Sequence, residues 1–468
     1  VENSSLVPWL AAGVLVHLLS AARVRPTNLA LTHLSAIFSY ALALYGTFLA
    51  RSGLLGDFSV HSFSGTGVGL WLVAVDAIVA LAGLSLLVWR AGKFPKGSPY
   101  PAHRSREFFL LLGCLALTFL AIIVFIGMSM PLLTGLGGDS AAVDTGFYVK
   151  TSLPLAICML LAMAVGSLLH YGEGQASLPK ALIGAIFAGA AAAGLAGVRE
   201  VSSLVLAGAA AVAAFASVLA WRGGALRLAA AVAHAGAALA LFTIALAAAG
   251  TSTTLEFVPD EPQSFGRNSI LYEGMDLSES RREKEYVFRV DGEEVRALTK
   301  LSASGEDAAR EPAIAHGAAG DIYIAPSPAA VGHEIVLQRG KAILEGDVAY
   351  RLEHVIEEEP DDEGRRLFLA DIAVTDGETV DLAEVSLTAA GMKAATESFA
   401  VLNGKRRLRL LGISEDKKSI MLQILPAIEE EARLPLTASV SNKPLLWLLW
   451  LGAAFTFFGT SCALRRRC

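Results

Sequence analysis

Nine long apolar runs constrain this 468-residue chain more than any other feature of its sequence. Each run approaches the length of about 20 residues that an α-helix needs to cross a bilayer core about 30 Å thick. Backbone groups in hydrocarbon must be hydrogen-bonded within the protein, so such runs are expected to be helices. The predicted spans are residues 5–22, 29–50, 68–88, 107–130, 148–169, 181–197, 201–220, 225–249 and 444–464.

Composition divides the chain into two parts with different surroundings. Hydrophobic residues make up 54% of the chain and charged residues 18%, whereas about a quarter of an ordinary soluble domain is charged. Residues 251–442 hold 21 Lys and Arg against 36 Asp and Glu, a net charge of −15, and the rest of the chain carries +9. These values exclude a soluble enzyme, a disordered protein and a nucleic-acid binder.

The distribution of Lys and Arg predicts the orientation of the spans. If residue 1 lies outside, the inner loops hold 13 basic residues, and the outer loops hold four: Arg51, Lys150, Arg199 and Lys443. Basic residues concentrate on the cytoplasmic side of a membrane protein. The acidic segment 251–442 is therefore expected outside, in the periplasm of a Gram-negative cell.

The acidic segment has the pattern of a β-rich domain. Short apolar or β-branched runs at 286–290, 322–325, 334–337, 367–374 and 420–424 are predicted strands. The pairs Asp291-Gly292, Asp376-Gly377 and Asn403-Gly404 predict hairpin turns. The acidic run 357–363 is interpreted as a solvated loop, with a cation site as the alternative.

The predicted fold class is thus a mainly α, polytopic membrane protein of about nine transmembrane helices with a β-rich periplasmic domain inserted before the last helix. Residues 1–250 form the helical bundle, 251–442 the β-rich domain, and 443–468 the final helix with a basic cytoplasmic tail. The four cysteines (Cys114, Cys158, Cys462 and Cys468) form no Cys-x-x-Cys pair, so neither a disulfide framework nor a thiolate metal site is expected. The first apolar run lacks a basic flank and a cleavage site, so it is not interpreted as a signal peptide.

Two histidines lie deep in predicted spans, where an ionisable group marks a candidate site. At 1.5 Å per residue, His17 lies about 18 Å and His234 about 16 Å from the outer face. The two imidazoles are therefore predicted at one level on different helices, as a bis-histidine heme b requires. A buried, hydrogen-bonded histidine and a proton-relay residue remain alternatives at this point.

Two further sequence positions carry candidate chemistry. The outer loop after the second span places Arg51 and His61 among glycines and apolar residues, where a porphyrin would find an axial nitrogen and a cation for a propionate. The alternative is a simple connector. Asp76 lies about nine residues into the third span. It either hydrogen-bonds a neighbouring helix, is protonated in place, or takes up protons for redox chemistry.

Several separated motifs resemble one known family. These are the first ten residues (Val-Glu-Asn-Ser-Ser-Leu-Val-Pro-Trp-Leu), His17, the stretches 46–53 and 59–63, and Gly-Asp-Ile-Tyr at 320–323. In this order and on these membrane sides they resemble CcmF, the heme lyase subunit of cytochrome c-type biogenesis (System I). The resemblance runs the whole length of the chain.

The resemblance implies a heme lyase, or holocytochrome c synthase, component in the bacterial inner membrane. Such a protein accepts heme from a periplasmic heme chaperone and supports its attachment to the Cys-x-x-Cys-His motif of apocytochrome c. It also holds a heme b, which reduces the incoming heme with electrons from quinol. His17 and His234 match the two heme b ligands, and His61 matches a periplasmic ligand of the delivered heme. Thiol-reductase and apocytochrome-binding maturation subunits are further implied partners.

The chain departs from the family pattern at its start. The tryptophan-rich loop of the family precedes the Val-Glu-Asn motif with which this chain begins, and the helices before that loop are also missing. We therefore expect that the chain is a fragment or works with a separate polypeptide, and that alone it is inactive. The alternative functions are a heme transporter or exporter, and a non-catalytic assembly module that docks basic partners through the acidic segment.

Overall fold

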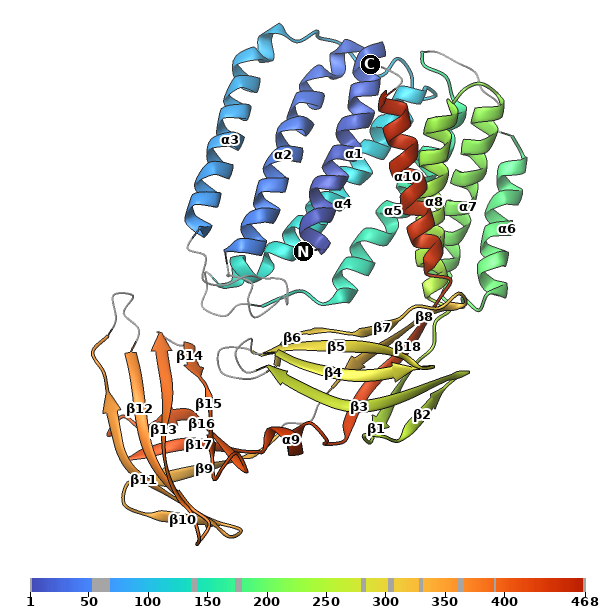
Figure 1. Cartoon of the computed structure of the whole chain (residues 1–468). Helices are drawn as coiled ribbons and strands as arrows, with labels where there is room; N and C mark the ends of the chain where they lie inside the picture. The colour runs from blue at the N-terminus through green and yellow to red at the C-terminus, as the bar shows by residue number, and fades with distance from the viewer. Residues whose placement is uncertain are drawn as a thin grey trace.

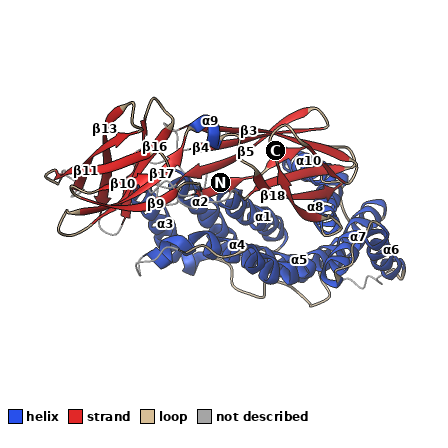
Figure 2. Cartoon of the chain, turned by 90° about the horizontal axis from the view of Figure 1, so that it is seen from below, coloured by secondary structure: helices blue, strands red, loops and turns tan. Residues whose placement is uncertain are grey.

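The computed structural model describes residues 2–52, 68–135, 141–172, 179–278, 283–301, 307–327, 331–360, 366–390 and 393–465. Helices and strands gather in two separate parts of the molecule (Figures 1 and 2). The strands lie at one end of the helical bundle, and the chain begins at that same end (Figure 1). The C-terminus lies at the opposite end of the bundle, as the predicted orientation requires.

Long apolar helices form the first part, as the sequence predicts. They are α1 (Glu2–Val24), α2 (Leu29–Arg51), α3 (Gly69–Arg90), α4 (Arg106–Gly135), α5 (Thr145–Leu168), α6 (Ala181–Leu195), α7 (Val201–Arg222), α8 (Leu228–Ala247) and α10 (Trp447–Arg465), with short 3₁₀ turns η1 (Pro26–Asn28) and η2 (Ala91–Lys93). Eight helices of the described residues are long and apolar enough to cross a membrane, so the chain is a multi-pass membrane protein.

The sixth predicted span is shorter than expected. The run 181–197 predicts a helix of 17 residues, but α6 holds 15 and ends before Gly197, whose φ is +107°. At 1.5 Å per residue α6 is about 22 Å long, less than a bilayer core of about 30 Å. It packs along α7 at the edge of the bundle (Figure 1).

The bundle has two packing centres that meet at α4 and α5. One lies among α1, α2 and α4 and includes Val7, Phe48 and Val124. The other lies among α5, α6, α7 and α8 and includes Leu160 and Ala213. Because α4 packs against α5, the two groups form one bundle, with α1 and α8 belonging to different groups.

The last helix returns to the bundle and packs on α8 through glycines. A Cβ at Gly236 of α8 would lie 2.6 Å from the carbonyl oxygen of Gly452, and one at Gly459 would lie 2.5 Å from the amide nitrogen of Ala233. Small residues allow this close backbone approach. Inside lipid no hydrophobic force drives helices together, so close van der Waals packing takes that role. Thr456 adds a hydrogen bond to the Ala233 carbonyl at 3.4 Å.

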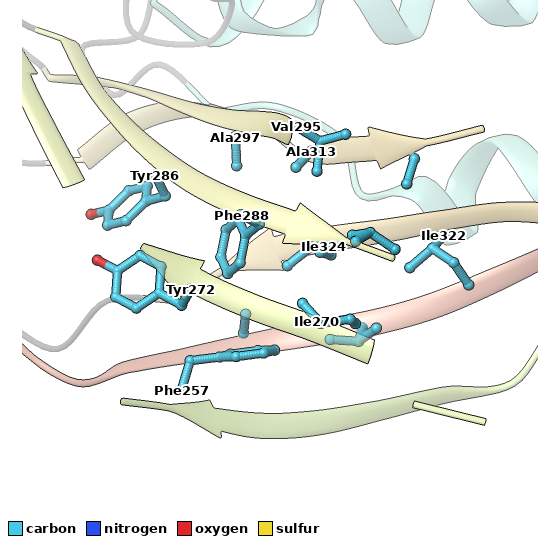
Figure 3. Close-up of a cluster of buried hydrophobic side chains, with 14 of the residues drawn as sticks. Phe257, Ile270, Tyr272, Tyr286, Phe288, Val295, Ala297, Ala313, Ile322 and Ile324 are labelled. Carbon is cyan, nitrogen blue, oxygen red and sulfur yellow. The ribbon is translucent and has the colours of Figure 1, made fainter. Parts of the chain in front are cut away.

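The strands of the first β unit pair in two antiparallel sheets around one core. One sheet has the order β1 (Ser252–Phe257), β18 (Leu436–Pro444), β8 (Gly320–Pro326) and β7 (Ala313–Ala315), and the other has β2 (Pro262–Phe265), β3 (Asn268–Ser278), β4 (Glu283–Val290), β5 (Glu293–Leu301) and β6 (Asp307–Glu311). Phe288 packs in the core against Phe257 and Tyr272, with ring centroids 5.5 and 5.2 Å away (Figure 3).

A second β unit has its own core and is inserted between β8 and β18. Its sheets are β15 (Ser398–Val401), β16 (Arg406–Ile413), β17 (Ser419–Pro426) and β9 (His333–Gln338), and β10 (Ala342–Glu345), β11 (Val348–Glu357), β12 (Arg366–Thr375), β13 (Val380–Ala390) and β14 (Lys393–Thr396). The short helix α9 (Ile428–Glu431) follows this unit. The alternation of apolar residues along strands predicts each strand but not which strands share a core, so the sequence did not reveal two units.

The predicted strands and turns of the acidic segment are confirmed. The five runs lie in β4, β8, β9, β12 and β17, and the three dipeptides join β4 to β5, β12 to β13, and β15 to β16. At the first turn the Ser269 N–H and the Asn268 amide donate to Asp291 and hold the pKa of that carboxyl below its usual range. Of the acidic run, residues 358–360 are exposed and 361–363 lie outside the described residues.

A buried carboxylate on α9 joins the two β units. Glu431 pairs with Lys284 of the first unit at 3.1 Å and with Arg407 of the second. The Arg407 side chain also donates to the Pro426 carbonyl at 3.1 Å. A buried charge is costly unless it is paired, so this cluster fixes how the units meet.

The contact between α8 and α10 predicts opposite effects for two glycine substitutions. Gly236→Ala should lower the melting temperature, because overpacking costs about 1–3 kcal/mol and exceeds the gain in helix propensity of about 1 kcal/mol. Gly184→Ala on α6 is the control, since a Cβ there meets nothing within 4 Å, and it should be neutral or stabilising. Thermal unfolding in detergent measures both, and a rise in both would contradict the packing described.

Candidate functional site

Two imidazoles from different helices lie close together inside the bundle, with their ring planes nearly parallel. The ring centroids of His17 on α1 and His234 on α8 are 6.0 Å apart, and the ring planes differ by 8°. Both side chains are half-buried. The structure thus brings together the two deep histidines that the sequence predicts at one level, although α1 and α8 belong to different packing groups.

Each imidazole is oriented by a hydrogen bond at Nδ1. His17 Nδ1 donates to the Gly13 carbonyl one turn earlier at 2.7 Å. His234 Nδ1 shares a hydrogen bond of 3.3 Å with the Ser167 hydroxyl at the end of α5. A ligating histidine usually uses its other ring nitrogen in this way, which fixes the ring and leaves Nε2 for the metal.

Arg106 holds the polypeptide around the His234 side of the pair. Its guanidinium donates to the carbonyls of Gly166, Ser167 and Ala225 at 3.1, 2.8 and 2.9 Å. It also lies over the ring of Tyr171, 5.2 Å from the centroid. One cation therefore ties the start of α4 to the end of α5 and to the connection between α7 and α8.

Sequence reasoning missed Arg106 and Ser167 as parts of this site. Arg106 counted only as one basic residue of an inner loop. The signal available was the pair Arg106-Glu107 at a helix start, where Glu107 is buried and accepts both hydrogen bonds of the Gly172 N–H, at 3.0 and 3.2 Å. Nothing local in a sequence indicates that an arginine will reach carbonyls 60 and more residues away.

The distance between the two ring centroids matches that expected for two imidazoles bound to one metal. Two imidazoles that point end-on at one metal have centroids about 6 Å apart, because each metal–nitrogen bond is about 2 Å long and each nitrogen lies about 1 Å from its ring centre. The observed centroid distance of 6.0 Å agrees with that value. Within the described residues, no group of three or more His, Cys, Asp or Glu side chains is able to hold a metal ion. Two imidazoles alone therefore fit a metal whose other ligands come from a planar macrocycle.

Other predicted positions lie elsewhere. His61 lies outside the described residues, and Arg51 is the exposed last residue of α2, so the structure does not test whether they act together. Asp76 is half-buried on α3, and its Oδ1 is buried without a hydrogen-bond partner among the described residues. Proton uptake at Asp76 stays a hypothesis.

The known proteins that this chain resembles are named as cytochrome c-type biogenesis proteins. The chain is 34% identical over 179 residues to the cytochrome c-type biogenesis protein CcmF of Haemophilus influenzae, covering 38% of this chain and 27% of that protein. It is 34% identical over 171 residues to the probable cytochrome c-type biogenesis protein NrfE of Escherichia coli, covering 36% of this chain and 30% of the relative. This chain resembles the CcmF proteins.

Other comparisons set the extent of this likeness. The E. coli CcmF protein is 35% identical over 176 residues, which are 37% of this chain and 27% of that protein. The chain thus spans between a quarter and a third of the curated relatives it matches. A solved structure of cytochrome c heme lyase CcmF aligns with 98% of this chain and 58% of its own, at 17% identity and a TM-score of 0.48. No family model matches the chain.

The role of Arg106 predicts a large loss of stability on its removal. Arg106→Gln should lower the free energy of unfolding by about 1–3 kcal/mol, because carbonyls of Gly166, Ser167 and Ala225 lose their donor. Arg104→Gln is the control, since Arg104 is exposed, and it should change the value by less than about 0.5 kcal/mol. Denaturant unfolding in detergent compares the two variants. Equal losses of unfolding free energy would show that the hydrogen bonds of Arg106 to these carbonyls contribute little to stability.

Proposed function

We propose that this chain is the heme-handling part of a cytochrome c maturation system in the bacterial inner membrane. In this proposal His17 and His234 hold a heme b within the bilayer, and the protein supports covalent attachment of a delivered heme to apocytochrome c. The observation that carries the proposal is the pair of parallel imidazoles with centroids 6.0 Å apart and both Nδ1 atoms hydrogen-bonded. The names of the relatives, cytochrome c-type biogenesis protein and heme lyase, support the same role.

The chain's own residues would bind and orient the heme b in this proposal. The Nε2 atoms of His17 and His234 would hold the heme iron, while Gly13 and Ser167 keep the rings from turning. An imidazole coordinates a metal in its neutral form. Heme b, when bound, supplies one-electron transfer to the incoming heme iron.

The outer side of the membrane is the proposed place of heme attachment. A delivered heme, brought by a periplasmic heme chaperone, would be ligated by His61, with Arg51 at a propionate. Each thioether forms as a cysteine S–H of the Cys-x-x-Cys-His motif adds across a vinyl C=C, the sulfur to one carbon and hydrogen to the other. Bringing thiol and vinyl together in fixed orientation supplies much of the rate.

The two β units would lie in the periplasm and receive partners. Residues 251–442 carry a net charge of −15, and the basic loops of the bundle favour placing this segment outside. An acidic surface attracts basic partners and speeds their encounter. We infer that apocytochrome c and the subunits that reduce and present its thiols approach on this side, and that quinol supplies electrons from the membrane.

The ligand assignment predicts a spectroscopic loss in either single histidine variant. The purified chain should show a reduced b-type absorption spectrum, and His17→Ala or His234→Ala should abolish it, since one axial ligand is removed. His33→Ala is the matched control, because His33 makes the same 2.7 Å bond from Nδ1 to a carbonyl four residues earlier but lies exposed on α2. A spectrum that survives in both site variants would refute the assignment.

The proposed delivery site predicts that spectrum and maturation separate. His61→Ala should leave the b-type spectrum intact and reduce cytochrome c maturation at least tenfold in cells that contain the complete system. His103→Ala, in an exposed loop at the other end of the bundle, should leave both unchanged. Covalent heme staining of the cytochrome measures maturation, and normal staining with His61→Ala would remove His61 from the mechanism.

A further inference from the structure

His316 lies at a cavity where the first β unit meets the last helix. The cavity has a volume of about 530 Å³ and is lined by His316, Gly317, Ala318, Asp321, Trp447 and Trp450. These residues come from the connection between β7 and β8, from the start of β8, and from the first turn of α10. This junction lies at the end of the bundle that faces the strands (Figure 1).

The connection between β7 and β8 is held in place by several hydrogen bonds. Trp447 Nε1 donates to the Ala318 carbonyl at 3.1 Å, and the Leu445 N–H donates to the Ala319 carbonyl at 3.1 Å. Gly320 has a φ of +152°, and a Cβ there would lie 2.5 Å from the Lys443 carbonyl oxygen, so only glycine fits. The segment is therefore a fixed platform for the residues that it carries.

His316 is oriented on this platform by a buried carboxylate. Its Nδ1 donates to Asp321 Oδ2 at 3.0 Å, and Asp321 Oδ1 accepts from the Gly317 N–H at 3.3 Å. Asp321 is 4% exposed, whereas the His316 side chain is 71% exposed. A carboxylate at Nδ1 makes Nε2 a better metal ligand and fixes the direction of the ring.

Two indoles complete the lining on the side of α10. Trp447 and Trp450 are 46% and 69% exposed and lie three residues apart, on one face of the helix. Tryptophans often lie at membrane surfaces, and that role alone explains their place at the start of a span. It does not explain the buried carboxylate that orients an exposed imidazole beside them.

We propose that this cavity takes a planar iron porphyrin, with His316 Nε2 as an axial ligand and the indoles of Trp447 and Trp450 against the ring. Among the described residues only one imidazole lines the cavity, and they hold no group of three or more His, Cys, Asp or Glu side chains able to bind a metal. A bare cation therefore finds too few ligands, whereas a porphyrin brings four. The volume lies within the range of about 300–1,000 Å³ found for small-molecule sites. The site deepens the proposed function, on which it rests: it is a transfer point for delivered heme, separate from the pair His17 and His234.

Hemin titration of the purified full chain in detergent tests the site. We expect wild-type protein to bind ferric hemin beyond any heme it already carries, with a red shift of the Soret band, in a step that His61→Ala leaves in place. His316→Ala should weaken this step at least tenfold, and Trp450→Leu should weaken it less. His333→Ala is the matched control, since His333 is an exposed histidine of the second β unit that pairs with Glu345 at 2.5 Å, and it should titrate as wild type.

Metal-free protoporphyrin separates ligation from stacking in the same experiment. Metal-free protoporphyrin should bind wild-type protein at least tenfold more weakly than hemin does. It should bind wild type and His316→Ala with equal affinity. The proposal is overturned if His316→Ala and His333→Ala bind hemin alike, or if metal-free protoporphyrin binds wild type as tightly as hemin does. Failure of the proposed function is read separately, as absence of the b-type spectrum that depends on His17 and His234.

Discussion

A polar side chain inside a bilayer must find its hydrogen bonds within the protein, and this requirement shapes the bundle. Water is absent from the hydrocarbon core, and an unmet polar group there costs several kcal/mol. His17 uses a carbonyl of its own helix, whereas His234 needs Ser167 from α5. Because Ser167 lies at a helix end, its position depends in turn on Arg106, which donates to the carbonyls there.

These linked hydrogen bonds explain why the site contains residues from both packing groups. α1 supplies one imidazole from the first group, and α8 supplies the other from the second. Arg106 stands at the start of α4, the helix through which the groups meet, and reaches both α5 and the connection before α8. The distance between the rings is therefore set by the contact between α4 and α5 more than by any direct packing of α1 on α8.

The sequence predicts those features that depend on local pattern. Length and hydropathy alone locate the helices, and alternation with Asp-Gly or Asn-Gly turns locates the strands, because both signals arise from neighbours along the chain. The level of His17 and His234 follows from a helical rise that hardly varies. Their mutual approach, by contrast, depends on which helices pack together, and no periodicity contains that information. For the same reason the sequence does not predict the contacts of Arg106 or the division of the strands between two cores. It also does not predict the pairing of Glu431 with Lys284 and Arg407.

The two histidine sites use one device in different surroundings. Inside the bilayer Nδ1 is bonded to neutral groups, a carbonyl and a hydroxyl, because a carboxylate there would carry a heavy desolvation cost. At the junction with the first β unit, His316 can hydrogen-bond the carboxylate of Asp321, since this site lies near water, where a charge costs less. In the proposed scheme His17 and His234 together would hold a resident heme, whereas His316 alone would leave a coordination position of a delivered heme free. A ligand held from one side in an open cavity can be passed on, which is the property that a site of transfer needs.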